Sequence, residues 1–181
     1  NNGMNLNIIV RGYLYKKNWT PLSTAKQKYP NYTQDFRKLI ENYKELFDNL
    51  SQKYKVTITF TSYDNCPEFI KKIIFNNNWN LHLISEENST QFSSCCSYLK
   101  TVDDNVNLII RSDLVIKKKL IVLLSNFDYQ KCTNMIVLSK EPNMKLNDIF
   151  LITPPGAKLK IIKKLKNASH GHKLSGMIVS C

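Results

Sequence analysis

The chain has 181 residues, of which 43% are hydrophobic and 22% are charged, and this composition is typical of a globular domain and excludes a disordered one. Its length predicts a single domain over residues 1–181 that buries about two-thirds of its unfolded surface, standing alone or as one module of a longer polypeptide. No apolar run approaches the ~20 residues of a membrane span, so no membrane-spanning helix is expected.

The formal net charge of +12 raises the question of a polyanionic partner. Only three of the 26 basic residues are arginines, namely Arg11, Arg37 and Arg111. Sites that bind nucleic acid usually combine arginine with exposed aromatic side chains, so the lysine excess favours a solvated basic surface, and nucleic acid is not the expected partner. The five cysteines form no CxxC pair, and their odd number favours reduced thiols. A cytoplasmic protein is therefore expected.

Strands and helices alternate along the first hundred residues. The run NLNIIVRGYL at 5–14 is apolar and β-branched and predicts a strand. Residues 35–54 carry apolar side chains at steps of three and four, which predicts a helix with one buried face. The next predicted elements are a strand at 55–61, a helix that begins near Pro67, a short strand at 81–84 and a helix at 91–100.

The alternation continues in the second half of the chain. The most strand-like segment is 108–116, and the apolar run at 120–124 indicates a helix, although a strand is also compatible with it. Strands are predicted at 135–138 and 149–152, and a basic helix follows at 157–166. Because strands alternate with helices, we expect an α/β fold with a mostly parallel sheet flanked by helices.

Polar side chains follow three of the predicted strands, where an open α/β sheet binds its ligands. Arginine offers a planar fork of donors suited to phosphate, and a carboxylate can bind a metal ion or a sugar hydroxyl. An ion pair between Arg111 and Asp113 with a purely structural role is the alternative. The residues selected by this rule are Arg11 and Gly12 after the first strand, Thr61, Ser62, Tyr63 and Asp64 after the second, and Arg111 to Asp113 on the central strand.

Several nucleotide-binding and hydrolytic classes lack their motifs here. The chain has five glycines and contains neither GxGxxG nor GxxxxGK[ST]. It also lacks HExxH and the Gly-x-Ser-x-Gly elbow. A phosphate-bearing ligand is therefore expected to be bound by side chains, a metal ion or strand-end amides.

The segment LIIRSDLVIKKKLIVLL at 108–124 resembles the central segment of GT-A-type glycosyltransferases, in which an apolar strand ends in an Asp-x-Asp motif and a helix follows. The resemblance implies a single-domain, GT-A-like (Rossmann-like) fold, similar to the small versions that large DNA viruses encode, which would place the protein in the host cytoplasm. In this family the motif binds a divalent metal ion and the ribose-diphosphate of a sugar nucleotide. Here Arg111 stands in the place of the first aspartate, so the site loses one carboxylate and gains a cation.

The resemblance also implies roles for residues outside the motif. Arg11 and Gly12 would lie beside the base, with residues 61–64 lining the nucleotide pocket. Asp113 would contact the diphosphate and the Mn²⁺ or Mg²⁺ ion, and Asp148 would be the catalytic base. His170 and His172, in SHGHKL, resemble the late histidines that complete the metal shell in some members. Because Arg111 replaces an acidic residue, either the metal is held with help from other groups or Arg111 itself neutralises the leaving diphosphate.

The function implied is transfer of a sugar from a UDP-sugar or another nucleoside-diphosphate sugar to a hydroxyl acceptor such as a glycan. The alternative, from a different class, is a non-catalytic basic α/β module that binds nucleic acid or a protein partner. The net charge supports this alternative, and it predicts affinity for nucleic acid that falls steeply with salt.

Overall fold

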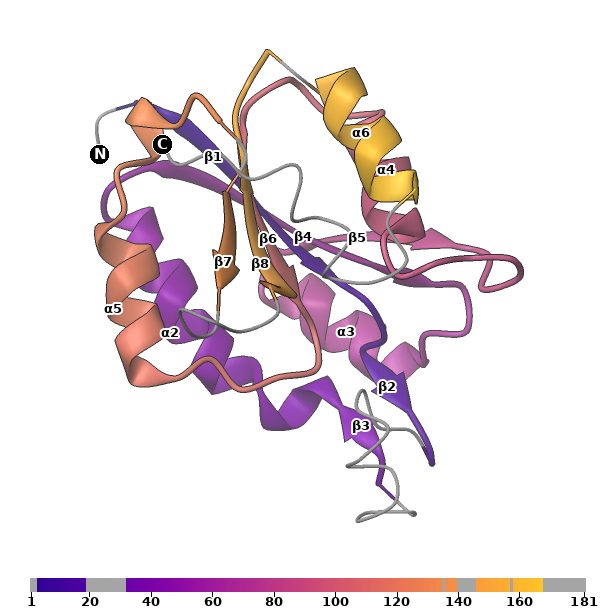
Figure 1. Cartoon of the computed structure of the whole chain (residues 1–181). Coiled ribbons are helices and arrows are strands. Elements are labelled where there is room, and N and C mark those ends of the chain that lie inside the picture. The colour runs from indigo at the N-terminus through magenta and orange to yellow at the C-terminus, as the bar shows by residue number, and fades with distance from the viewer. Residues whose placement is uncertain (1–2, 19–31, 135, 140–145, 157, 168–181) are drawn as a thin grey trace.

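The computed structural model describes residues 3–18, 32–134, 136–139, 146–156 and 158–167. Its centre is a six-stranded sheet with helices on both faces (Figure 1). The strands, in their order across the sheet, are β5 (Asn80–Ile84), β4 (Lys55–Tyr63), β1 (Asn5–Arg11), β6 (Val106–Arg111), β8 (Leu146–Thr153) and β7 (Ile136–Ser139).

The sheet is mostly parallel. β5, β4, β1 and β6 run in the same direction, while β8 is antiparallel to both of its neighbours. The predicted fold class, an α/β domain with a mostly parallel sheet flanked by helices, is therefore confirmed. From β1 the chain extends the sheet on one side through β4 and β5, and it then crosses to the other side of β1 to form β6. The order of the strands thus reverses between β1 and β6.

Each face of the sheet buries its own hydrophobic cluster, because successive side chains of a strand point to opposite faces. In β1, Leu6, Ile8 and Val10 belong to one cluster and Ile9 to the other. The helices divide in the same way, as Figure 1 shows. The first cluster is covered by α2 (Ile40–Ser51), α3 (Glu68–Asn76) and α5 (Lys118–Asn126), and the second by α4 (Ser93–Leu99) and α6 (Lys158–Asn167).

An aromatic group fills the centre of the first cluster. Phe60 of β4 is fully buried, and its ring centroid lies 5.1 Å from those of both Phe36 and Trp79. Phe47 of α2 completes the group, 5.4 Å from Trp79. The pairs Phe36–Phe60 and Phe47–Trp79 pack edge-on, and such a pair adds about 0.5–1.5 kcal/mol to the effect of burial. The aromatic group thus ties α2 to β4 directly beneath the strand end that carries Thr61.

The central strand ends earlier than the sequence indicates. A strand is predicted at 108–116, but β6 ends at Arg111, and residues 112–117 form a turn and a loop before α5. Asn42 of α2 holds this loop, because its side chain accepts from Ile116 N at 2.7 Å and donates to Ile116 O at 2.9 Å. Ser112 and Asp113 therefore follow the strand and are not part of it.

A small ladder lies beyond the carboxyl end of the main sheet (Figure 1). It pairs β2 (Tyr15–Lys16) with β3 (Gln34–Asp35) in antiparallel fashion. The amide of Gln34, which is buried, donates to Ser112 O at 3.4 Å. The ladder thus supports the turn that follows β6. Within the described part of the chain, no helix has the length and apolar character needed to cross a membrane.

Candidate functional site

A cavity of about 100 Å³ opens at the carboxyl ends of β1 and β6. This is the point where the strand order reverses, and open α/β sheets bind ligands in the crevice at such a point. The register places Arg11 beside both Thr61 and Arg111, so β1 and β6 end at the same level, while β4 continues two residues further to Tyr63. The residues that line the cavity are Arg11, Gly12, Tyr13, Tyr63, Gln91, Arg111, Ser112 and Asp113.

Hydrogen bonds hold the two strand ends tightly together. Gly12 N donates to Thr61 O and Ser112 N donates to Arg11 O, both at 3.0 Å. The Ser112 hydroxyl donates to Tyr13 O at 2.6 Å. Gly12 has a φ of +115°, and a Cβ atom there would lie 2.9 Å from Ser112 Oγ. Only glycine at position 12 therefore allows the chain to turn after β1 so close to Ser112, which follows β6.

Replacing Gly12 with alanine is expected to lower the free energy of unfolding by about 2–4 kcal/mol, because left-handed strain adds to the contact with Ser112. Gly156 provides a matched control, since its φ is +86° but a Cβ atom there meets nothing within 4 Å. Gly156→Ala should cost only the strain, about 1–2 kcal/mol. Urea denaturation of the two variants measures the difference, and equal losses would show that the close approach at Gly12 has no energetic weight.

Arg11 extends from the end of β1 into a largely closed setting. Its side chain is 3% exposed, its Nη1 donates to Gln91 O at 3.1 Å, and its guanidinium lies 4.2 Å from the centroid of the Phe92 ring. A buried guanidinium is costly to desolvate, whereas stacking on an aromatic ring recovers part of that cost. The loop before α4 therefore fixes a positive charge at the cavity.

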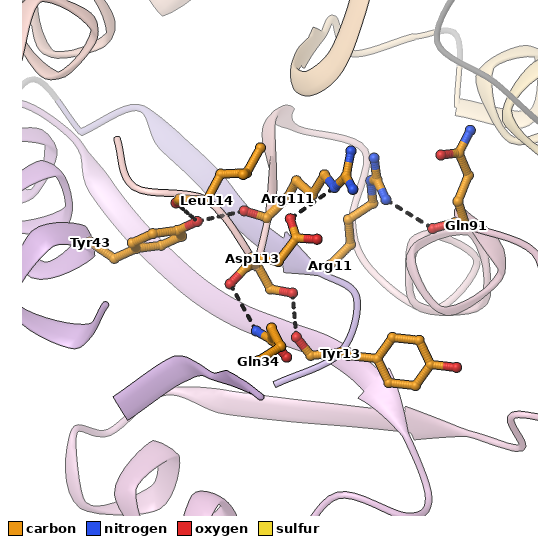
Figure 2. Close-up of polar contacts among 9 residues, drawn as sticks. Arg11, Tyr13, Gln34, Tyr43, Gln91, Arg111, Asp113 and Leu114 are labelled. Carbon is orange, nitrogen blue, oxygen red and sulfur yellow. Dashed lines mark hydrogen bonds and ion pairs between the residues drawn. The ribbon is translucent and has the colours of Figure 1, made fainter. Parts of the chain in front are cut away.

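Arg111 and Asp113 form the ion pair that the sequence left as an alternative to a ligand site. Arg111 Nε lies 2.8 Å from Asp113 Oδ1, and the Asp113 side chain is 4% exposed. Burial raises the pKa of the Asp113 carboxyl, while the charge and hydrogen bond of Arg111 act in the opposite direction. The pair borders the cavity and is not sealed beneath packed side chains, since both residues line it. Figure 2 shows the guanidinium groups of Arg11 and Arg111 extending in the same direction from neighbouring strands.

Tyr43 fixes the backbone beneath this pair. Its hydroxyl lies 2.6 Å from Arg111 O and 2.7 Å from Leu114 O, so it can donate to either carbonyl (Figure 2). Burial raises the pKa of Tyr43, which keeps the hydroxyl protonated and able to donate. The turn that presents Asp113 is thus anchored to α2.

Two tyrosines form the other wall of the cavity. The ring centroids of Tyr13 and Tyr63 are 4.5 Å apart. The Tyr13 hydroxyl donates to Glu86, which also accepts from Lys16 Nζ at 3.4 Å. Burial and the neighbouring Glu86 raise the pKa of Tyr13. Aromatic rings are therefore held next to the cationic part of the cavity.

The structure brings together six of the residues selected from the sequence, namely Arg11, Gly12, Tyr63, Arg111, Ser112 and Asp113. Thr61 and Ser62 are buried behind the cavity, and Asp64 is exposed to solvent outside it.

The remaining selected residues are Asp148, His170 and His172. Asp148 belongs to β8, two residues before Phe150, which pairs with Ile110. Its backbone therefore lies at the same end of the sheet as Arg111. His170 and His172 lie outside the described residues.

Tyr13 and Gln91 line the cavity, and Tyr43 supports it, but the sequence did not select them. Tyr13 directly follows Gly12, so adjacency in the same loop was a usable signal. Gln91 reaches the cavity because of how the loop before α4 folds. No local sequence pattern indicates that position.

The donors at the cavity do not suit the divalent metal ion that the family resemblance implies. Such ions take six or more oxygen ligands, often from several carboxylates. Asp113 is the only carboxylate among the lining residues described, and it is paired with Arg111. Across the described ranges, no group of three or more His, Cys, Asp or Glu side chains is placed to bind a metal. The described residues at this cavity therefore do not fit a divalent metal ion.

A larger cavity, of about 440 Å³, lies at the opposite end of the sheet. It is lined by the start of β4 and by side chains that include Lys44, Asp48 and Trp79. Volume alone favours this cavity, but it lies at the amino ends of the strands and contains no arginine. Ligands of open α/β sheets bind at the carboxyl ends, so the smaller cavity is the stronger candidate.

Comparisons with known proteins bear on the fold. No family model and no curated protein matches the chain. Among solved structures, the protein Aq1419 of Aquifex aeolicus VF5 is 16% identical, with a TM-score of 0.54, and the match covers 97% of this chain and 84% of that one. The glycosyltransferase GlyE of Streptococcus pneumoniae TIGR4 is 14% identical, with a TM-score of 0.47, and the match covers 96% of this chain but only 42% of GlyE. The likeness to Aq1419 shows a shared fold.

Proposed function

We propose that the chain is a glycosyltransferase that moves a sugar from a nucleoside-diphosphate sugar to a hydroxyl acceptor. One observation carries the proposal: two guanidinium groups, from Arg11 and Arg111, border one cavity at the point where the strand order reverses. Guanidinium is the side-chain group best shaped for bidentate contact with phosphate oxygens. The resemblance of residues 108–124 to the nucleotide-sugar segment of GT-A-type enzymes points to the same place.

The size and lining of the cavity suggest how a donor would lie. Ligand pockets usually measure about 300–1,000 Å³, so a cavity of about 100 Å³ suits the diphosphate alone. The base would lie against the wall that Tyr13 forms with the buried Tyr63. Gln91 adds an amide that is buried without a hydrogen-bond partner for its Nε2 among the described residues. The sugar would extend toward the beginning of β8, which carries Asp148.

The chemistry requires a stabilised leaving group and a base. The acceptor oxygen bonds to the anomeric carbon of the sugar, and the bond from that carbon to the diphosphate breaks with its electron pair on the diphosphate oxygen. Arg11 and Arg111 would stabilise the charge that develops there. Asp113 would hold Arg111 in position, and Asp148 would take the proton of the acceptor hydroxyl if the reaction inverts configuration.

The proposal is tested by calorimetric titration of the full chain with UDP-glucose, UDP-N-acetylglucosamine, UDP-galactose and GDP-mannose. At least one of these donors is expected to bind and to be displaced by its nucleoside diphosphate. The absence of binding across the whole set would end the proposal. Binding of duplex DNA or RNA in its place, with an affinity that falls steeply with salt, would favour the basic binding module.

Two variants locate the binding. Arg111→Lys keeps the charge beside Asp113 but loses the planar fork, so the affinity for the donor is expected to fall about tenfold. Removing the charge instead would leave Asp113 buried and unpaired, which is strongly destabilising. Lys44→Gln alters the larger cavity and should change nothing. A loss of affinity in Lys44→Gln without a loss in Arg111→Lys would place the binding site at the larger cavity and contradict the proposal.

A further inference from the structure

The charges around the smaller cavity are those of an anion site. Its described lining residues contribute two guanidinium groups and one carboxylate. Both arginines come from strand ends that are paired in register, Arg11 with Arg111. The sheet therefore fixes the main chain of both arginines, and the loop before α4 holds the guanidinium of Arg11 through Gln91 and Phe92.

The single carboxylate is already engaged. Asp113 Oδ1 lies 2.8 Å from Arg111 Nε, and Tyr43 and Gln34 hold the main chain on either side of it through Arg111 O, Leu114 O and Ser112 O. A divalent cation on this oxygen would have to displace the guanidinium or lie against it. Displacement would mean rearranging a turn that is anchored to both α2 and β3.

We infer that this site binds the diphosphate of its nucleotide through Arg11 and Arg111 directly, without a bridging divalent metal ion. The inference rests on the proposed function, and it gives the two arginines the task that a metal ion performs in GT-A-type enzymes. In such a site Asp113 is a positioning residue, since it acts through Arg111 and does not touch the diphosphate. The guanidinium groups supply the hydrogen-bond donors for the diphosphate. No metal ion therefore has to bind together with the nucleotide sugar.

The test is the affinity of the full chain for UDP and GDP, measured by calorimetry in EDTA and again with Mn²⁺. At least one of the two nucleotides is expected to bind in EDTA and no more tightly with Mn²⁺. Affinity that appears only with Mn²⁺, or rises tenfold or more with it, would overturn the inference while leaving the proposed function standing. The absence of binding in both buffers would overturn both. The full chain includes His170 and His172, so the measurement covers any ligands that they provide.

Asp113→Asn separates the two roles of the carboxylate, because it removes the charge and keeps the shape. If the arginines bind the diphosphate, Asp113→Asn should change the affinity for the nucleotide by the same factor in EDTA and in Mn²⁺, because Asp113 acts only through Arg111. If Asp113 is a metal ligand, the affinity in Mn²⁺ should fall tenfold or more while the affinity in EDTA does not, which would overturn the inference. The comparison of buffers on the native chain needs no variant, so it decides the matter even if Asp113→Asn is unstable.

Discussion

Replacing Phe60 with alanine is expected to lower the free energy of unfolding by about 3–5 kcal/mol. The Phe60 side chain is fully buried, and its ring centroid lies within 6.4 Å of those of Phe36, Phe47 and Trp79. The substitution would leave a cavity between α2 and β4 that these rigid rings cannot fill by small movements. Urea denaturation followed by circular dichroism measures the loss.

Phe75→Ala is the matched control, since the same atoms are removed from a side chain that is 82% exposed. Its effect is expected within about 0.5 kcal/mol. A loss below about 1 kcal/mol for Phe60→Ala would mean that the aromatic group is not a fixed core. Such a result would also remove the support for the strand end that carries Thr61.

The parts of the fold that follow from local pattern were predictable. The apolar spacing at 35–54 predicted a helix whose buried face includes Tyr43, and α2 lies within this range. The β-branched run at 55–61 predicted β4, although the strand continues to Tyr63. In both cases the side chains that define the pattern are the ones that become buried.

The end of the central strand was not predictable in the same way. Leu114, Val115 and Ile116 look like the continuation of a strand, but Val115 is 65% exposed and Ile116 is 2% exposed in the loop after β6. Instead of pairing with a neighbouring strand, this segment is held by hydrogen bonds to Tyr43 and Asn42, which lie about 70 residues away in the chain. Such long-range partners leave no trace in the local sequence.

In the candidate site, too, local features were predictable from the sequence and long-range contacts were not. The rule that ligands bind at carboxyl strand ends selected Arg11 and Arg111 without knowledge of their register. That they lie side by side depends on the pairing of β1 with β6, which are separated by about 100 residues. The contact of Arg11 with Phe92 and Gln91 depends on how the loop before α4 folds back over β1. Sequence reasoning therefore found the charged groups but not the walls around them.

Replacing Arg11 with methionine is expected to weaken the binding of a nucleoside diphosphate at least a hundredfold, equivalent to about 2.8 kcal/mol. The reason is that charge-assisted hydrogen bonds to phosphate are among the strongest a side chain makes. The fold should tolerate the change, with unfolding altered by no more than about 1 kcal/mol. Methionine can keep its contact with the Phe92 ring, and the pair of Arg111 with Asp113 remains complete. Calorimetry and urea denaturation of the same preparation measure both effects.

Arg37→Met is the control that makes the result specific. Arg37 also lies over a phenylalanine ring, 4.5 Å from the centroid of Phe69, and pairs with Asp35 at 2.8 Å. Its side chain is 47% exposed, however, and it does not line the cavity. Each variant lowers the net charge of the chain by one. A loss confined to Arg11→Met would therefore assign the binding to the position of the guanidinium and not to the basic surface as a whole. Equal weakening by both variants would instead indicate that the +12 charge attracts anions without a site, and unchanged binding in Arg11→Met would remove this arginine from the diphosphate.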